Sequence, residues 1–178
     1  IGRFAYYMMF SITSKISKFI SCNKQILKNK KGIIVSPSHL NEKWFKNYKE
    51  PNLKKINLLY VGRIRIEKGI FSLISIHTKL KKEVFLNIVS PSNDHKKIKK
   101  NKNVNLIDTL SEESLIDTYD KNLIFILPSY TEGHPQVLDE ALSRQRPVII
   151  FEDIQHVKKD RKGVFICKRN FEDLEKTI

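Results

Sequence analysis

The sequence contains little cysteine, and its histidines are not arranged as metal ligands. The two cysteines among 178 residues, Cys22 and Cys167, stand in no paired motif. This usage is typical of reduced thiols in a cytosolic protein and argues against a small domain held together by disulfides. The five histidines are scattered along the chain: His39, His77, His95, His134 and His156. The sequence therefore predicts no metal site.

Long apolar runs and glycine-rich nucleotide motifs are also missing. The longest early apolar run, Phe4–Phe10, is far short of the roughly 20 residues that a membrane-spanning helix needs. A secretory pattern of charged start, apolar middle and small-residue cleavage site is not present either. Neither G-x-G-x-x-G nor G-x-x-x-x-G-K-[ST] occurs, which excludes a dinucleotide fingerprint and a Walker loop.

The composition is that of a globular protein with an excess of basic residues. Hydrophobic residues make up 40% and charged residues 29%, and 178 residues are enough for one domain with a sizeable core. The formal net charge is +14. Apart from Lys96–Lys102, however, the lysines are dispersed, and aromatic residues do not alternate with them as base-stacking platforms would require. We therefore expect no nucleic acid partner, and favour an anionic membrane surface or anionic substrates.

Short apolar runs alternate with helical patterns from Ile56 onward. The runs are long enough for buried strands and too short for typical helices. They are Ile56–Val61, Val84–Val89, Val104–Ile107, Leu123–Leu127, Val148–Phe151 and Val164–Cys167. This alternation predicts an α/β fold with a doubly wound, Rossmann-like parallel sheet. In such sheets, ligands bind at the carboxyl ends of the strands.

The chain before this alternation has a different pattern. Ile1–Lys28 carries apolar residues at helical spacing with basic residues between them. It fits either a basic amphipathic helix on a membrane surface or a helix packed in a domain whose other parts are absent, and we favour the second. Gly32–Ser36 predicts a short strand. The polar, lysine-rich stretch Pro37–Pro51 predicts a linker or crossover between lobes, with Trp44–Phe45 as a local packing anchor.

The stretch Leu123–Val148, LIFILPSYTEGHPQVLDEALSRQRPV, predicts a strand, a loop, a helix and the start of another strand. A proline and a serine end the first strand, and Pro135 suits the first turn of the helix because its missing N–H is not needed there. The helical pattern continues to about Arg144. Two carboxylates bracket the turn, with Glu132 in the loop and Glu140 in the helix.

A second group of polar residues follows the strand Ile56–Val61. Gly62 allows the backbone to turn sharply or to approach a ligand closely. Arg63 and Lys68 stand at the carboxyl end of that strand, just before a helical pattern that begins at Ile70. Two cations beside a helix N-terminus favour a diphosphate. The alternative for these two side chains is a solvated surface pair.

Together, LLYVGRIRIEKGI (Leu58–Ile70) and FILPSYTEGHPQVLDEALSRQRPVI (Phe125–Ile149) resemble the donor half of family 4 glycosyltransferases, two-lobed enzymes of the B-type fold. The resemblance covers about Gly32 to the end of the chain. It implies that residues 36–178 are the C-terminal lobe, which binds the nucleotide sugar. Residues 1–35 would be the end of the N-terminal acceptor lobe and the crossover. With both ends truncated, we expect a fragment that is inactive alone.

The resemblance also implies a role for each matching position. Arg63 and Lys68 would hold the donor diphosphate and Glu132 would face the transferred sugar, so these three are the expected catalytic residues. Glu140 would accept hydrogen bonds from the ribose hydroxyls. The expected substrate-binding residues are Gly62, Gly133, His134, Pro135, Gln136 and Glu140. For His134, a contact through the side chain and a contribution of the backbone alone are both open.

The implied function is transfer of a sugar, with retention, from a nucleoside-diphosphate sugar to an acceptor glycan or glycolipid in cell-surface polysaccharide or glycolipid synthesis. Neither a metal nor a cofactor besides this donor is expected, and the location would be the cytoplasm or the inner face of the membrane. The alternative is a catalytically silent glycosyltransferase-like binding or scaffolding module. Ser90–Asn93 and Asp108 replace residues that are often glycine in the family, which leaves the preferred base and sugar open.

Overall fold

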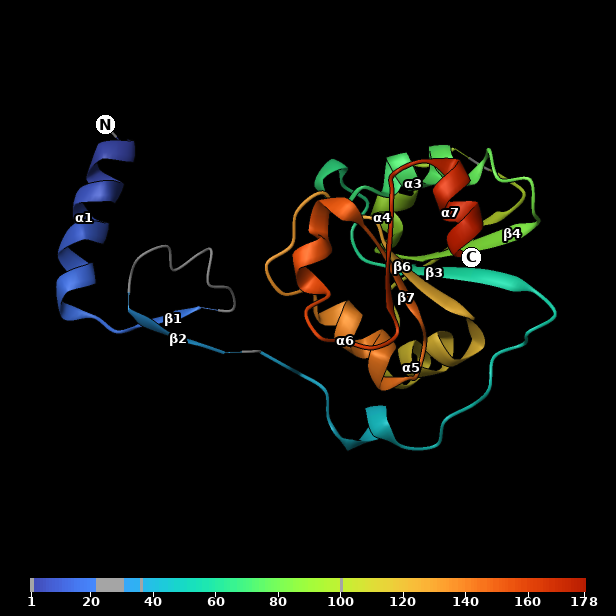
Figure 1. Ribbon diagram of the computed structural model, residues 1–178, viewed down its shortest axis with the longest axis horizontal. Helices are drawn as coiled ribbons and strands as arrows, with labels where there is room; N and C mark the ends of the chain where they lie inside the picture. The colour runs from blue at the N-terminus through green and yellow to red at the C-terminus, as the bar shows by residue number, and fades with distance from the viewer. Residues whose placement is uncertain (1, 22–30, 36, 100) are drawn as a thin grey trace. The chain divides into compact units, whose positions relative to one another are not determined.

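The computed structural model describes residues 2–21, 31–35, 37–99 and 101–178. The chain forms two compact units, Ile1–Ser38 and His39–Ile178. The first contains helix α1 (Gly2–Ile16) and two short parallel strands, β1 (Phe19–Ser21) and β2 (Gly32–Ile34) (Figure 1). The predicted strand after Lys31 is therefore confirmed. That this unit is the end of an acceptor lobe stays a prediction.

The helix predicted over Ile1–Lys28 is too long. It ends at Ile16, and Phe19–Ser21 is extended and pairs with β2, because a strand partner is available in the same unit. Residues 22–30, which include Cys22, lie outside the described part of the chain. Several large apolar side chains of α1 are exposed: Phe4, Tyr7, Met8, Met9 and Ile12. Among the described residues, no helix combines the length and the hydropathy needed to cross a membrane.

The second unit is built on a six-stranded parallel sheet, which confirms the doubly wound α/β fold. In spatial order, the strands are β5 (Val104–Ile107), β4 (Val84–Val89), β3 (Ile56–Val61), β6 (Ile124–Leu127), β7 (Val148–Phe151) and β8 (Val164–Cys167). Every neighbouring pair is parallel. The six predicted strands are all present, with β6 starting one residue later than expected.

Helices cover both faces of this sheet. The helices are α3 (Ile70–His77), α4 (Ser92–His95), α5 (Glu112–Lys121), α6 (Gln136–Ser143) and α7 (Phe171–Thr177), and the 3-10 segments are η1 (Glu42–Phe45), η2 (Ile66–Lys68) and η3 (Glu152–Val157). Figure 1 shows α3 and α7 on one side of the sheet and α5 and α6 on the other. The residues of each strand alternate between the two layers: Leu58 and Tyr60 pack in the α3/α7 layer, and Leu59 packs in the α5/α6 layer.

The chain reverses its direction of travel across the sheet between β3 and β6. From β3 it proceeds through β4 to β5 at one edge, and then returns to β6 and proceeds to β8 at the other. Neighbouring strands whose connections leave in opposite directions open a crevice at their carboxyl ends, where ligands bind in this type of sheet. The two segments at that crevice are 62–69, after β3, and 128–135, after β6.

Of the two alternatives for Pro37–Pro51, a free linker is wrong from His39 onward, where the 39–178 unit begins, and a crossover between lobes stays a prediction. Trp44 is the reason, since it is 1% exposed and packs edge-on against Tyr119 of α5, with 5.8 Å between the ring centroids. This confirms Trp44 as a packing anchor. Its neighbour Phe45 is exposed and contributes much less to that anchor.

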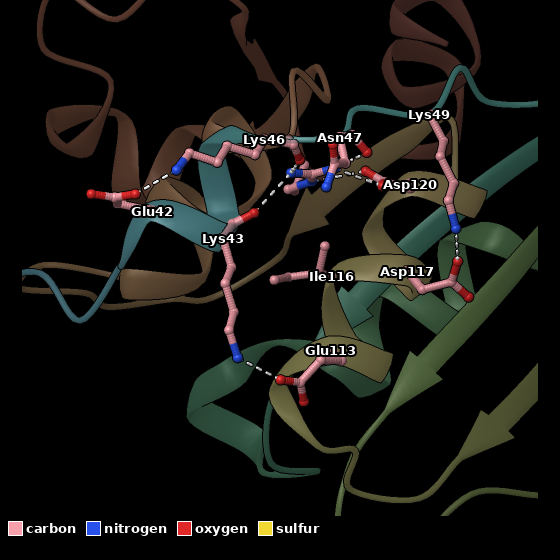
Figure 2. Close-up of a pocket in the computed structure, with 10 residues that line it drawn as sticks. Glu42, Lys43, Lys46, Asn47, Lys49, Glu113, Ile116, Asp117 and Asp120 are labelled. Carbon is pink, nitrogen blue, oxygen red and sulfur yellow. Dashed lines mark hydrogen bonds and ion pairs between the residues drawn. The ribbon is translucent and has the colours of Figure 1, made fainter.

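Figure 2 shows Asn47 of the same segment close to Asp120 of α5, and a buried arginine is hydrogen-bonded to both. Arg144, fully buried at the end of α6, donates from Nε and Nη2 to the two carboxylate oxygens of Asp120 at 2.9 and 2.7 Å. Its Nη1 donates to the backbone carbonyls of Trp44 and Lys46 at 3.0 and 2.8 Å. The guanidinium therefore ties the backbone of residues 44–46 to α5 and α6, whereas the backbone of a free linker would have no such partner.

We expect Arg144→Ala to destabilise the chain by about 3–5 kcal/mol, because it leaves the Asp120 carboxylate buried without its partner. Chemical denaturation followed by circular dichroism measures this change. The matched control is Lys49→Ala, which removes an exposed ion pair with Asp117 and should cost no more than about 1 kcal/mol. Equal unfolding midpoints for the two variants would contradict a structural role for the buried pair.

Candidate functional site

A cavity of about 470 Å³ lies at the carboxyl ends of β3 and β6. Its lining is Tyr60, Val61, Gly62, Arg63, Arg65, Glu67, Lys68, Leu127, Glu132, Pro135, Gln136, Val137 and Glu140. It contains all of the residues predicted for the site except Gly133 and His134. The topology of the sheet thus brings together the two groups that the sequence analysis identified separately.

The turn after β3 is shaped by a glycine and a buried tyrosine. The Tyr60 hydroxyl donates to the backbone oxygen of Arg63 at 2.7 Å, and burial, followed by nearby carboxylates, raises the pKa of Tyr60 so that it keeps this proton. Gly62 has a φ of 155°, and a Cβ there would lie 2.9 Å from the tyrosine oxygen. Any larger residue would therefore push Arg63 away from its place in the cavity lining.

Three cations line the cavity, one more than predicted. Arg63 and Arg65 are exposed and Lys68 is half-buried. Lys68 lies at the end of η2, and its Nζ is 2.7 Å from Oε1 of Glu132. Arg65 was missed, although its place between the two predicted cations was a signal that could have identified it. This concentration of positive charge makes the β3 side of the cavity suited to an anion.

Glu132 is held in a fixed orientation. Its Oε1 accepts hydrogen bonds from Lys68 and, at 2.6 Å, from the Ser129 hydroxyl. Its backbone oxygen lies 2.8 Å from Nε2 of His156, which donates to it in the tautomer that carries the proton there. The carboxylate side chain is 10% exposed. An ionised group that is this restricted can face a substrate with little further ordering.

The segment 128–135 is joined directly to the segment after β3. The Tyr130 N–H donates to the backbone oxygen of Glu67 at 3.0 Å. Gly69 has a φ of 67°, and a Cβ on it would lie 1.8 Å from the oxygen of Pro128, so the two backbones touch at this point. The position of Glu132 relative to Lys68 therefore depends on a contact that glycine alone allows.

Arg169, between β8 and α7, supports the same segment and was missed by the sequence analysis. It donates to the backbone oxygens of Pro128 at 2.8 Å and Ser129 at 3.2 Å. Its guanidinium also lies over the Tyr130 ring, 4.0 Å from the centroid. It also forms an ion pair with Asp153 at 2.6 Å. No sequence pattern connects a residue after the last strand with a loop so much earlier in the chain.

Glu140 lies in α6 and is 5% exposed, with a close side-chain neighbour at each carboxylate oxygen. The Tyr119 hydroxyl donates to Oε2 at 2.7 Å, and Nε2 of His39 lies 2.8 Å from Oε1. Burial, and then the charge of Glu140, raise the pKa of Tyr119 well above its usual value. Tyr119 therefore remains a hydrogen-bond donor to the carboxylate, which α6 contributes to the lining of the cavity.

The turn before α6 offers its backbone to the cavity, because the side chain of His134 is turned away. His134 is 4% exposed at the side chain, and its Nε2 lies 3.0 Å from Oδ2 of Asp139, close enough for a charge interaction but not aligned as a hydrogen bond. No side chain among the described residues caps the start of α6, where Pro135 is the N-cap and Gln136 the first residue. The Leu138 N–H donates to the backbone oxygen of Pro135, so the N–H groups of Gln136 and Val137 are the ones in this turn that can meet an anion.

Metal binding has no support in the part of the chain that the structure describes. Among those residues, no three or more His, Cys, Asp or Glu side chains are grouped as possible ligands. Cys167, predicted to be a reduced thiol, is free and buried, and burial raises its pKa to about 11.

Comparisons with known proteins agree with this geometry. The family model described as "Glycosyl transferases group 1" matches residues 41–178. A comparison of the sequence with curated proteins gives no match. Among solved structures, the sucrose-phosphate synthase of Thermosynechococcus elongatus is similar with a TM-score of 0.69 and 19% identity over 88% of this chain and 47% of that one.

Two further solved structures share the fold at similarly low identity. TarM has a TM-score of 0.71 and 18% identity over 90% of this chain and 35% of its own. WaaG, a glycosyltransferase involved in lipopolysaccharide biosynthesis, has a TM-score of 0.64 and 15% identity over 89% of this chain and 53% of its own. The chain thus spans about half, or less, of the length of these structures.

We expect Gly69→Ala to destabilise the chain more than Gly163→Ala, by about 1–3 kcal/mol, because the added methyl meets the Pro128 backbone. Both glycines have positive φ, but a Cβ at Gly163 would lie at an ordinary 3.6 Å from Leu142. The comparison therefore separates the clash from the backbone strain, and denaturant unfolding measures both. If the two variants are equally stable, the contact between the two segments does not constrain the site.

Proposed function

The chain belongs to the glycosyl transferases group 1 family, and we propose that its 39–178 unit binds the nucleoside-diphosphate sugar from which a sugar is transferred. The observation that carries the proposal is the shared cavity. Three cations and two fixed carboxylates, from segments distant in the sequence, line one cavity at the reversal point of the sheet. In a nucleoside-diphosphate sugar, the negatively charged diphosphate lies between the ribose and the transferred sugar. Cations suit the diphosphate, and carboxylates suit the hydroxyl groups of the two sugars.

The cations and the α6 N-terminus would bind the diphosphate. Cleavage of the bond between sugar and phosphate leaves negative charge on the diphosphate, and donors already in place stabilise that charge as it develops. Each such donor contributes about 2.7–4 kcal/mol, by comparison with removal of one oxyanion donor. Lys68 has three N–H groups, so it can donate to a phosphate oxygen while it keeps its contact with Glu132.

Glu132 would face the transferred sugar. Its carboxylate can accept hydrogen bonds from sugar hydroxyls and favour positive charge on the sugar ring as the bond to the diphosphate breaks. The ion pair with Lys68 places this carboxylate next to the diphosphate side of the cavity. We propose that the sugar is transferred with retention and without a metal or a cofactor besides the donor.

Glu140 would bind the ribose of the nucleotide. Its buried carboxylate, hydrogen-bonded by Tyr119, is an acceptor that suits sugar hydroxyls. The whole protein would combine this unit with an acceptor lobe, and transfer the sugar to a glycan or glycolipid of the cell surface, in the cytoplasm or at the inner face of the membrane. On this proposal, the chain spans the donor half and does not transfer the sugar alone.

We expect the sugar conjugates of UDP, GDP or ADP to raise the thermal stability of the chain. At a ligand concentration of about 100 times Kd, the stabilisation is about 2.7 kcal/mol. Lys68→Ala and Glu140→Ala each remove a charged hydrogen-bonding partner, worth about 1.5–3 kcal/mol, and should raise Kd roughly 10- to 100-fold. Isothermal titration calorimetry measures these Kd values. Lys49→Ala is the control, because Lys49 lies outside the cavity and its replacement should leave Kd unchanged. A wild-type chain that binds none of the three classes would overturn the proposal.

Glu132→Gln tests the sugar contact separately from the diphosphate contact. Loss of the carboxylate charge should weaken binding of the nucleotide sugar about tenfold and leave that of the corresponding nucleoside diphosphate nearly unchanged. The affinities of wild type and variant for both ligands, measured in the same titration series, give the loss for each ligand. An equal loss for both ligands would mean that Glu132 acts on the diphosphate through Lys68 and does not contact the sugar.

A further inference from the structure

The geometry points to His39 as a further positioning residue, which holds the Glu140 carboxylate so that it selects a nucleotide with free ribose hydroxyls. This inference rests on the proposed function, since it concerns the ribose end of the same cavity. His39 belongs to the predicted linker, to which the sequence analysis assigned no role in binding. Its Nε2 lies 2.8 Å from Oε1 of Glu140.

His39 is placed by a segment that is fixed from several sides. Its ring stands at 83° to that of Trp44, with 6.2 Å between the centroids. Trp44 donates from its indole nitrogen to Glu112 at 3.0 Å, and its backbone oxygen accepts from buried Arg144. The histidine side chain itself is 43% exposed. Its backbone is thus anchored next to a buried residue, while the ring reaches the carboxylate from the solvent side.

Two side chains contact the carboxylate, one at each oxygen. A carboxylate has about four acceptor positions, two on each oxygen, and only accepts hydrogen bonds when it is ionised. The Tyr119 hydroxyl occupies one position on Oε2, and Nε2 of His39 makes a close ion-pair contact with Oε1. Each oxygen thus has one protein neighbour and can still accept a hydrogen bond from one of the adjacent 2′ and 3′ hydroxyls of a ribose.

Loss of His39 would remove this arrangement on one side. Tyr119 would then be the one remaining neighbour of the carboxylate, and Oε1 of Glu140 would bind water or another donor. The carboxylate could then rotate, so that it no longer faces both ribose hydroxyls. The affinity for a ribonucleotide then falls, whereas a nucleotide without the 2′ and 3′ hydroxyls makes no use of this arrangement. His39 thus determines discrimination between the two, and a residue needed solely for stability would affect both alike.

The experiment compares UDP, GDP and ADP with their 2′,3′-dideoxy forms by calorimetry, on the full 178-residue chain. For the nucleotide that binds wild type most tightly, His39→Ala should weaken binding about tenfold, and its dideoxy form should change less than about twofold. His39→Gln, which restores an N–H donor, should recover most of the loss. Lys43→Ala is the matched control, because it removes an exposed ion pair from the same segment and should leave both affinities unchanged.

His39→Met is the control for a disturbed segment, because methionine keeps an apolar side chain against Trp44 but has no N–H donor. It should weaken binding as much as His39→Ala does. Equal losses for the ribose and dideoxy forms, or no recovery with glutamine, would overturn the assignment. So would unchanged binding in His39→Ala and His39→Met. If wild type binds none of the three nucleotides, the proposed function fails and the inference fails with it, which distinguishes that result from a failure at His39 alone.

Discussion

The pairing of β3 with β6 is the constraint on which the site depends. Because the connections of these two strands leave in opposite directions, the segments that follow them meet at one edge of the sheet. Gly69 and Pro128 touch there through their backbones, and Tyr130 is hydrogen-bonded to Glu67. The distance between the backbones that carry the cations after β3 and the carboxylate after β6 is therefore set by these contacts.

The charge of the whole chain and the charge of the site have different origins. The net charge of +14 is spread over the surface, and lysines of the 43–49 segment are neutralised by acidic residues of the same unit (Figure 2). At the cavity, two cations are also paired, since Lys68 contacts Glu132 and Arg65 lies 3.6 Å from Glu67. Positive potential at the β3 side then depends on how Arg63 and these two pairs are arranged, and local arrangement matters more than the total charge.

Local pattern was enough to predict the strands and the cavity residues of the central loops. Glu132 and Glu140 lie in one strand–loop–helix unit, so spacing alone relates them. Arg169 and His39 could not be found in this way, because each acts on a loop or helix far away in the sequence. The linker prediction failed for a related reason: polar composition suggested a free segment, whereas one tryptophan and the distant Arg144 hold it against the helices. The roles assigned to the cavity residues stay predictions.

The two halves of the cavity differ in how far they are arranged before a ligand binds. Glu140 and Tyr119 are buried, and the hydrogen bond between them restricts the orientation of the carboxylate. Arg63 and Arg65 are exposed, and long exposed side chains lose conformational freedom when they close on a ligand. The carboxylate side can therefore discriminate between nucleotides at low entropic cost. The cation side attracts any diphosphate and must become ordered around it, so selectivity is expected to reside with Glu140 and the residues that hold it.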